Sequence, residues 1–284
     1  MICAAEKCPA RRSSKSDPMQ KKRNIPVVLT IAGSDSGGGA GIQADLRTFT
    51  ALNVFGVSAI TALTAQNPHE IKAVQPVGPK MVAMQIKAVC DYFPVAAVKT
   101  GMLYDEKTVR VAAKELEQRK FPIVVIDPVC RATSGRMLLT KKALGALCSD
   151  LLPLATVITP NVPEAELILN CKIKTHSDQR AAAGKLSQKF KTACVIKGGH
   201  LPGNETVDVL CYHGRIHSFK ARRLDVQSLH GSGCVFSSAL AAGLARGMEM
   251  KNAVMHAKKY VFQLIQDKNE TIDCRHRTAD LVKK

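Results

Sequence analysis

The 284 residues include 41 Lys and Arg against 23 Asp and Glu, a formal net charge of +18, and 46% of them are hydrophobic. A chain of this length and apolar content can bury the core of one large α/β domain. The absence of Trp and the 4% aromatic content fit a sheet packed by Val, Ile, Ala and Leu. No stretch approaches 18 uninterrupted apolar residues, which argues against a membrane span.

A strong positive charge is also the footprint of nucleic-acid binding. Residues 1–24 hold seven Lys and Arg and two acidic residues, so they contribute +5 and the remainder contributes +13. The basic residues of the remainder are spread over expected helix faces, without an aromatic stacking platform or a groove-reading helix. We therefore expect a solvated basic surface that steers anionic substrates, and no dedicated nucleic-acid site.

The ten cysteines are scattered and form no Cys-x-x-Cys pair, which favours a reduced intracellular protein over a disulfide framework or zinc site. Residues 1–24 are polar and lack apolar periodicity, so we expect a disordered basic extension followed by a single domain over 25–284. A cytoplasmic location is expected. The Arg and Ser content of the extension keeps organelle targeting open.

Strands and helices alternate along the remainder. A buried strand over 27–32 leads into a glycine-rich loop and an amphipathic helix with Ile42, Leu46, Phe49 and Leu52 on one face. Further strands are predicted over 54–63, 96–99, 123–127, 156–159 and 193–197, a hairpin over 207–219, and helices over 80–91, 105–118, 140–151, 163–169, 177–190, 231–246 and 251–267. This alternation predicts a mostly parallel sheet with helices on both faces and ligands at the carboxyl ends of the strands.

Two glycine loops precede helices in this order. In His230-Gly231-Ser232-Gly233-Cys234 the amides of Gly231, Ser232 and Gly233 can converge on a phosphate at a helix N-terminus. The same field would lower the pKa of the Cys234 thiol and make it a proton acceptor beside a reacting hydroxyl. Close helix packing is the alternative explanation for such a loop taken alone.

The first loop, residues 33–41, follows a buried strand. It is not a Walker A loop, because no Gly-Lys-Ser/Thr follows, and it lacks the spacing of a dinucleotide fingerprint. A strand, a glycine loop and a helix in succession are nevertheless a common ligand-binding arrangement.

Both loops and several ordered blocks resemble the ribokinase-like superfamily and, within it, the hydroxymethylpyrimidine and phosphomethylpyrimidine kinases of thiamine biosynthesis. The blocks include Gly38-Gly39-Ala40-Gly41-Ile42-Gln43-Ala44-Asp45, Lys99-Thr100-Gly101-Met102-Leu103, Asp127-Pro128-Val129, Thr159-Pro160-Asn161-Val162-Pro163-Glu164 and Lys197-Gly198-Gly199-His200. They cover the chain from about residue 27 to about residue 267. The resemblance implies a ribokinase-like fold and a kinase that uses ATP and Mg²⁺.

On the phosphate side, Lys197 can neutralise nucleotide phosphates from a strand end, although a surface lysine at a tight turn is the plain alternative. Asn161 and Glu164 lie one helical turn apart, which aims both at one point. The resemblance places them on the Mg²⁺ and phosphate side, and helix capping by Asn161 is compatible with that role. Asp127 is a candidate to orient metal or phosphate, or a strand-terminating turn residue.

On the acceptor side, Gln66 offers a donor and an acceptor to a heteroaromatic edge, Met102 offers a polarizable face, and Gly33 permits close approach. The resemblance implies pyrimidine contacts at Gly33, Asp45, Gln66, Met102 and Cys234. The alternatives are a strand-end turn for Gln66, a core position for Met102 and a helix polar face for Asp45.

Two positions depart from the family pattern. Thr133 stands where the family carries a lysine, for which Arg131 or Arg136 are the nearest replacements. Ser36-Gly37 replaces the family's Pro-Ser, which we expect to loosen the first loop.

The sequence therefore predicts an ATP- and Mg²⁺-dependent kinase of 4-amino-5-hydroxymethyl-2-methylpyrimidine and its monophosphate, with these small molecules and ATP as partners, no membrane partner, and a homodimer as a possible assembly. Pyridoxal kinase activity is the nearest alternative, because a hydroxymethyl-bearing heteroaromatic ring fits the same site. A catalytically silent pyrimidine-binding regulator is the alternative from another class.

Overall fold

The computed structural model describes residues 25–67, 70–131, 135, 137–224 and 230–271. Their centre is one nine-stranded sheet in the order β3-β2-β1-β4-β5-β6-β7-β8-β9. Strands β2, β1, β4, β5, β6 and β7 run parallel to their neighbours, whereas β3, β8 and β9 pair in antiparallel fashion. The strands are β1 Val27–Asp35, β2 Phe55–Gln66, β3 Ile71–Pro76, β4 Val95–Thr100, β5 Val124–Ile126, β6 Val157–Ile158, β7 Ala193–Ile196, β8 Glu205–Tyr212 and β9 Arg215–Arg222.

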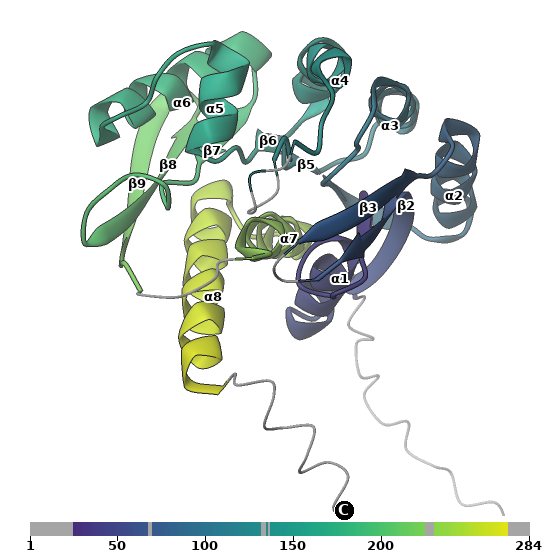
Figure 1. Cartoon of the computed structure of the whole chain (residues 1–284), viewed down its shortest axis with the longest axis horizontal. Coiled ribbons are helices and arrows are strands. Elements are labelled where there is room, and N and C mark those ends of the chain that lie inside the picture. Colours follow the sequence, from purple (N-terminus) through teal and green to yellow (C-terminus); the bar gives the residue numbers. More distant parts are fainter. Residues whose placement is uncertain (1–24, 68–69, 132–134, 136, 225–229, 272–284) are drawn as a thin grey trace, which may run out of the picture.

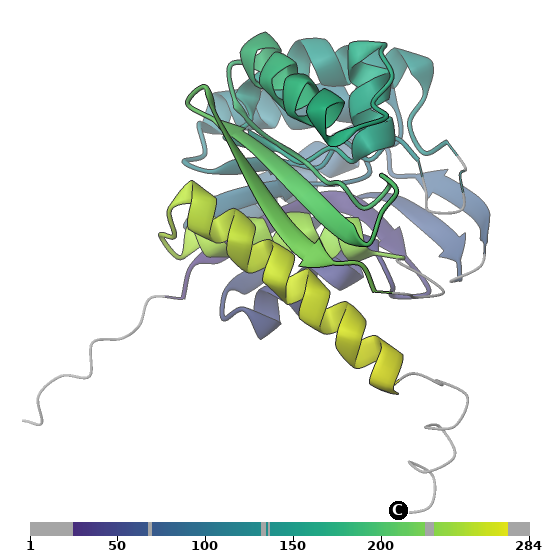
Figure 2. The same ribbon diagram turned by 90° about the vertical axis from the view of Figure 1, so that its left-hand side faces the viewer.

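Helices cover both faces of this sheet (Figure 1). One face carries α2 Pro79–Tyr92, α3 Glu106–Arg119, α4 Lys141–Ala146, α5 Val162–Leu169 and α6 His176–Phe190. The opposite face carries α1 Gly41–Ala51, α7 Ser232–Ala245 and α8 Met250–Thr271. Figure 2 shows α8 running along the β8–β9 hairpin, and the two elements are in contact. None of the described helices combines the length and apolarity needed to cross a bilayer.

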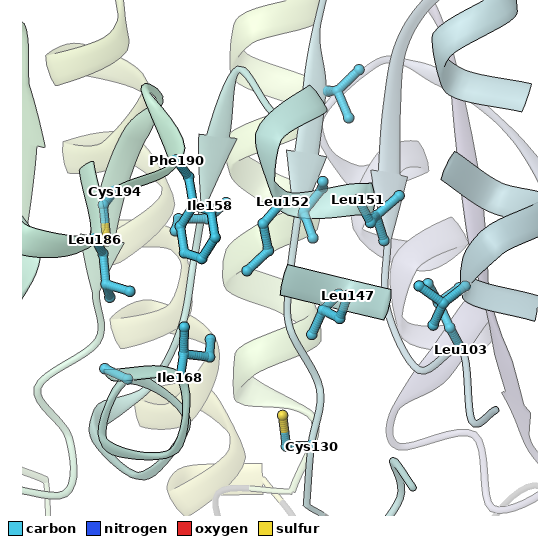
Figure 3. Packing of buried hydrophobic residues seen from close by; sticks show 14 of the residues in the cluster. Leu103, Cys130, Leu147, Leu151, Leu152, Ile158, Ile168, Leu186, Phe190 and Cys194 are labelled. Carbon is cyan, nitrogen blue, oxygen red and sulfur yellow. The ribbon is translucent and has the colours of Figure 1, made fainter. Parts of the chain in front are cut away.

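The core consists of two large apolar layers, one on each face of the sheet. Figure 3 shows the first, where Leu186 and Phe190 of α6 approach Ile158 and Cys194 of the strands. The second packs Phe49 of α1 and the small side chains of α7 against the other face. Because β1, β4, β5, β6 and β7 are buried on both faces, each is an almost continuous apolar run.

The predicted fold class is confirmed, and most predicted elements lie within a few residues of the observed ones. Two predictions were wrong in detail. Strand β3 was missed, and the helix predicted over 140–151 is a short α4 followed by a π-helical turn over Leu147–Leu151 and a 3₁₀ turn over Leu152–Leu154. The extension over 1–24 lies outside the described residues.

Candidate active site

The carboxyl ends of the parallel strands open into one cavity of about 570 Å³. Its walls include the residues after β1, β4, β5, β6 and β7, the end of β2, and the N-terminal turn of α7. Eleven of the twelve predicted site residues line it, namely Gly33, Gln66, Met102, Asp127, Asn161, Glu164, Lys197, Gly231, Ser232, Gly233 and Cys234. The twelfth, Asp45, lies behind the wall.

The two glycine loops touch each other at this cavity. Gly231 has φ +81°, and a Cβ atom there would lie 1.8 Å from the carbonyl oxygen of Gly39. Gly41 has φ +58°, and a Cβ atom there would lie 2.3 Å from the carbonyl oxygen of Gly33. Only glycine permits this backbone approach, so the first loop packs directly under the N-terminus of α7.

Asp35 holds the first loop in shape. Its Oδ1 accepts the Gly37 amide and its Oδ2 accepts the Ala40 amide, each at 2.8 Å. Oδ2 also lies 3.0 Å from Nε2 of His230, the residue that precedes the second loop. One buried carboxylate therefore organises the first loop and ties it to the second.

Asp45 forms a fully buried ion pair with Lys99 of β4. The Lys99 ammonium lies 2.9 and 2.8 Å from the two carboxylate oxygens, while Thr30 and Ser238 donate to the same carboxylate at 2.6 and 2.7 Å. Burial is the largest single contribution and opposes the charge of Lys99, but Asp45, together with Cys234 and Asp127, outweighs it and holds the pKa of Lys99 above its usual range. Lys99, not Asp45, reaches the cavity wall. Asp45 thus pairs with a lysine that lines the cavity and does not line the cavity itself.

Cys234 lies in the first turn of α7 and is half-buried. The expected lowering of its pKa is wrong: burial raises the pKa of the thiol to about 11, although the Lys99 ammonium and a hydrogen bond from the Gly41 amide work in the opposite direction. The nearby carboxylates of Asp45 and Asp127 also raise it. At neutral pH the group is therefore a thiol, because desolvation outweighs the cation and the amide.

Lys197 and Asp127 face each other beside the second loop. The Lys197 ammonium donates to Asp127 Oδ1 at 2.8 Å, and Ser237 of α7 donates to Oδ2 at 3.1 Å. Burial opposes the charge of Lys197, while Asp127 and Glu164 hold its pKa above the usual value. A Cβ atom at Gly233 would lie 3.4 Å from this ammonium. The cation thus stands at the amides of the α7 N-terminus, where both attract an anion.

Asn161 and Glu164 form a capping box at the start of α5. The Asn161 side chain accepts the Glu164 amide at 2.9 Å, and Glu164 Oε2 accepts the Asn161 amide at 2.8 Å. Both residues also line the cavity, so capping and a site role coexist. Burial raises the pKa of the Glu164 carboxyl to about 7, with Lys197 opposing the shift and Asp127 adding to it.

Gln66 and Met102 line the other end of the cavity. Met102 packs on Gly33 so closely that a Cβ atom at Gly33 would lie 2.5 Å from the Met102 methyl carbon. Ser36 donates to the Gln66 carbonyl and accepts the Gln66 amide, both at 2.8 Å. These contacts tether the first loop to the end of β2, against the expectation of a looser turn at Ser36-Gly37. Thr133 and Arg136 lie outside the described residues, while Arg131 lines the cavity.

A third group of contacts shapes the cavity near α8. Lys258 of α8 donates to Asp208 at 3.0 Å, and the other oxygen of Asp208 accepts the Gly198 amide at 2.9 Å. The buried Gln179 side chain donates to the carbonyls of Ile196 and Val207 at 2.9 and 2.8 Å, where β7 and β8 meet. These contacts hold the loop that carries Lys197.

Lys99 and Asp35 had no role assigned from the sequence alone. A lysine inside the apolar run of β4 signals a buried charge that needs a partner. An aspartate just before a glycine-rich turn signals a carboxylate that binds backbone amides. The spacing gives no direct sign of their partners, because Asp45 and His230 come from distant segments.

A mostly parallel sheet carries one cavity that holds the amide-lined N-terminus of α7, the lysine beside it and the ends of β2 and β4. This arrangement is that of the small-molecule kinases with the ribokinase-like fold. Comparisons with known proteins identify the family within this class. A family profile described as phosphomethylpyrimidine kinase matches residues 35–278. The chain belongs to the phosphomethylpyrimidine kinase family.

Curated relatives agree with this assignment. A hydroxymethylpyrimidine/phosphomethylpyrimidine kinase of Rhizobium meliloti is 44% identical over 243 residues, covering 84% of this chain and 90% of that protein. The thiamine biosynthesis bifunctional protein ThiED of Geobacter sulfurreducens is 42% identical over 239 residues. The match covers 84% of this chain and 49% of ThiED, so the chain spans about half the length of that relative.

Solved structures show the same fold. The phosphomethylpyrimidine kinase from Clostridium difficile 630 superimposes with a TM-score of 0.76 at 39% identity, covering 84% of this chain and 99% of that one. The pyridoxal kinase from Staphylococcus aureus, in complex with AMP-PCP and pyridoxal, superimposes with a TM-score of 0.77 at 33% identity, covering 85% and 88%.

Proposed function

We propose that the protein transfers the γ-phosphoryl group of ATP to 4-amino-5-hydroxymethyl-2-methylpyrimidine and to its monophosphate. The observation that carries the proposal is the position of the Lys197–Asp127 pair at the N-terminus of α7, in the same cavity as Gln66 and Met102. The family relatives named for these two phosphorylations support the choice of substrate. The complex of S. aureus pyridoxal kinase with AMP-PCP supports a nucleotide in this cavity.

The amides of Gly231, Ser232 and Gly233 and the Lys197 ammonium serve the transferred phosphoryl group. Phosphoryl transfer passes through a loose transition state whose negative charge spreads over the equatorial oxygens. Fixed amides and a fixed cation stabilise that charge without reorganisation during the reaction. The Asp127 carboxylate keeps the Lys197 ammonium in place through Oδ1, and Ser237 in turn holds the carboxylate by donating to Oδ2.

Cys234 serves the acceptor hydroxyl as a neutral hydrogen-bonding partner. With the alcohol, the hydroxyl oxygen bonds to the γ-phosphorus, the bond from this phosphorus to the bridging oxygen of ADP breaks, and the hydroxyl proton passes to the transferred phosphoryl group and then to solvent. With the monophosphate, an oxygen of the acceptor phosphate takes the place of the hydroxyl, and no hydroxyl proton has to be removed. Because the transition state is loose, the proton leaves late and needs no strong base beforehand. A thiol with a pKa of about 11 can therefore orient the hydroxyl without being ionised first.

Asp127 and Glu164 are the residues that would hold Mg²⁺. In the described ranges no group of three or more His, Cys, Asp and Glu side chains could hold a metal ion by itself. Mg²⁺ commonly uses one or two carboxylates together with substrate phosphates, so two carboxylates on the cavity wall fit it. When bound, the ion neutralises charge on the nucleotide phosphates. Burial raises the pKa of the Glu164 carboxyl to about 7. A bound cation would favour the ionised carboxylate, which could then coordinate it.

Pyridoxal is the second candidate acceptor, favoured by the likeness to the S. aureus pyridoxal kinase with pyridoxal bound. The two rings share a hydroxymethyl group and differ at the edge that Gln66 would read. A cytoplasmic location and a homodimer are further proposals made from the sequence. The seven cysteines without a disulfide in the described part of the chain, and the proposed use of ATP, support the cytoplasmic location.

A coupled assay of ADP release tests the proposal with the pyrimidine, its monophosphate and pyridoxal, each with and without Mg²⁺. The highest kcat/KM is expected for the two pyrimidines. Higher kcat/KM for pyridoxal would transfer the function to the second candidate. ATP turnover with none of the three would leave the silent regulator as the better explanation.

A further inference from the structure

His230, Asp35 and Gln66 form a small polar cluster that the proposed phosphoryl transfer leaves without a role for His230. His230 Nε2 lies 3.0 Å from Asp35 Oδ2 and 3.2 Å from the amide nitrogen of Gln66. The side chains of His230 and Asp35 are 17% and 4% exposed. A single ring nitrogen thus faces both a carboxylate and an amide at the edge of the acceptor pocket.

The Asp35 carboxylate determines whether Nε2 of the His230 ring carries a hydrogen. Both oxygens of Asp35 accept backbone amides, those of Gly37 and Ala40, so this group acts as an acceptor. An unprotonated Nε2 would set its lone pair against Oδ2. A protonated Nε2 donates to Oδ2 instead, so the contact requires the hydrogen on Nε2.

Both neighbours of the Gln66 amide then require the same orientation of that amide. If the amide nitrogen of Gln66 faced His230, two N–H donors, the amide and Nε2, would point at each other. If the amide oxygen faces His230, it can accept the Nε2 hydrogen together with Asp35. On the other side, the Thr64 hydroxyl lies 3.2 Å from the atom placed as Gln66 Oε1, and its single hydrogen is better directed to the Ser34 carbonyl at 2.9 Å, so we infer that the Gln66 oxygen and nitrogen are exchanged relative to their placed positions. Having used its hydrogen, Thr64 can only accept, which suits the amide nitrogen.

This orientation leaves the Gln66 amide with one hydrogen-bonding position on each atom. The oxygen keeps a second lone pair and the nitrogen keeps a second hydrogen. An amino group beside a ring nitrogen, the edge of an aminopyrimidine, supplies the matching hydrogen and lone pair. An edge that carries an ionised hydroxyl, as on pyridoxal, would set an oxygen against the amide oxygen.

We propose that His230 is a specificity-determining positioning residue: held by Asp35, it fixes the direction of the Gln66 amide and so selects an aminopyrimidine edge over a hydroxypyridine edge. The inference rests on the proposed function of the same site. Gly39 maintains the position of the ring, since a Cβ atom at Gly39 would lie 2.5 Å from His230 Cδ2 and 3.0 Å from Nε2.

The test compares His230→Gln with His230→Leu in the full chain. A glutamine amide nitrogen can donate to both Asp35 and Gln66, while leucine can donate to neither. We expect His230→Leu to lower the ratio of kcat/KM for the pyrimidine to that for pyridoxal by about 10-fold or more, the scale of a mispaired buried hydrogen bond. His230→Gln is expected to keep most of the ratio, and the KM for ATP should stay within about 2-fold in both variants.

A double-mutant cycle separates this role from a structural one. In a Gln66→Leu background, His230→Leu should change the ratio no further, because the effect passes through the amide. Selective ¹⁵N labelling of histidine should also show the hydrogen of His230 on Nε2 in the wild-type protein. An Nδ1–H tautomer, or an equal loss for both rings in His230→Leu, would overturn the inference.

The outcomes also separate the inference from the proposed function. If the wild-type protein phosphorylates neither ring, the proposed function fails, and calorimetric affinities of the two rings for wild type and His230→Leu then decide the inference. An unchanged affinity ratio would overturn it. If the wild type phosphorylates the pyrimidine and only the His230 variants behave otherwise than expected, the inference fails alone.

Discussion

Gly39 and Gly231 lie in direct backbone contact, since a Cβ atom on Gly231 would fall 1.8 Å from the Gly39 carbonyl oxygen. The first loop, which follows β1, and the second loop, which begins α7, therefore form a single wall of the active site. Residues nearly two hundred positions apart thus meet between the end of the cavity that we propose for the acceptor and the end that we propose for the phosphates.

Gly39→Ala tests the importance of that wall. The added methyl would lie 2.5 Å from the His230 ring, so either the ring or the loop must shift. A misplacement on the order of 1 Å can cost roughly 10²-fold in rate, and we expect at least about a 10-fold loss of kcat/KM for the acceptor. Steady-state kinetics with the pyrimidine measures it.

Gly184→Ala is the matched control for Gly39→Ala. Gly184 lies inside α6, and a Cβ atom there would meet nothing within 4 Å beyond the backbone of its own helix. This variant should keep full activity and gain about 0.5–1 kcal/mol of unfolding free energy. Equal kinetics in the two alanine variants would show that the contact between the loops tolerates a shift.

Gln66→Leu removes the amide that we propose reads the edge of the acceptor ring. Loss of a buried hydrogen-bond pair costs about 1–3 kcal/mol, so the KM for the pyrimidine should rise far more than the KM for ATP. Both constants are obtained from one set of coupled assays. Equal rises in the two would count against Gln66 as the residue that reads the ring edge.

Lys99→Met leaves the buried Asp45 carboxylate without its cation. Breaking a buried ion pair from one side costs about 3–5 kcal/mol, which urea unfolding measures as a lower midpoint. Asp45→Asn in the same chain removes the unpaired charge and keeps one of the two acceptor oxygens to which Thr30 and Ser238 donate, so the double variant should recover part of the loss.

Lys87→Met provides the surface comparison for Lys99→Met. Lys87 pairs with Asp91 at 2.6 Å, but their side chains are 66% and 52% exposed. Such a pair contributes about 0–1 kcal/mol. If the two methionine variants unfold at the same urea concentration, the Lys99–Asp45 pair is not a stabilising element of the site.

The sequence predicts much of this fold because its signals are local. Apolar runs bounded by glycine loops indicate buried strands, and those runs place Asp127, Asn161 and Lys197 at one edge of the sheet. Strand β3 escaped prediction because Ile71–Pro76 is a short edge strand with only partial burial, so it lacks a continuous apolar run. Edge strands of this kind depend on their neighbour for definition.

The electrostatics of the site could not be predicted in the same way. A cysteine at a helix N-terminus suggests a lowered pKa, yet the pKa of Cys234 depends on how deeply three-dimensional packing buries the thiol. The opposing contributions come from Lys99 of β4 and Gly41 of α1, which no spacing rule connects to Cys234. Likewise, only the folded chain shows that Asp45 reaches Lys99 and not the cavity.

The raised pKa of Cys234 predicts slow alkylation. With a pKa of about 11 against 9.0 for an ordinary thiol, the thiolate fraction at neutral pH is roughly 100-fold smaller. Well below pH 11 the thiolate fraction is small, and it increases about 10-fold per pH unit. The rate of iodoacetamide labelling, followed by mass spectrometry, should therefore increase steadily from pH 7 to 10. Rapid labelling at pH 7 that levels off would show a low-pKa thiolate instead.

Substitution of Cys234 itself tests whether the thiol orients the hydroxyl. Cys234→Ala removes the hydrogen-bonding partner, so kcat should fall by roughly 10²-fold, while the KM for ATP changes little because the loop amides and Lys197 remain. Cys234→Ser keeps a neutral donor and acceptor at the same position and should retain most of the rate if orientation is the main contribution.

Cys234→Asp should also turn over. It introduces a negative charge near Asp45 and Asp127, both of which already raise the pKa of the thiol, so it should be slower than the serine variant. A serine variant as slow as alanine, with an active aspartate variant, would show that catalysis needs an ionised base at this position. Full activity in the alanine variant would leave Cys234 as packing and assign the reaction to positioning by the amides of α7.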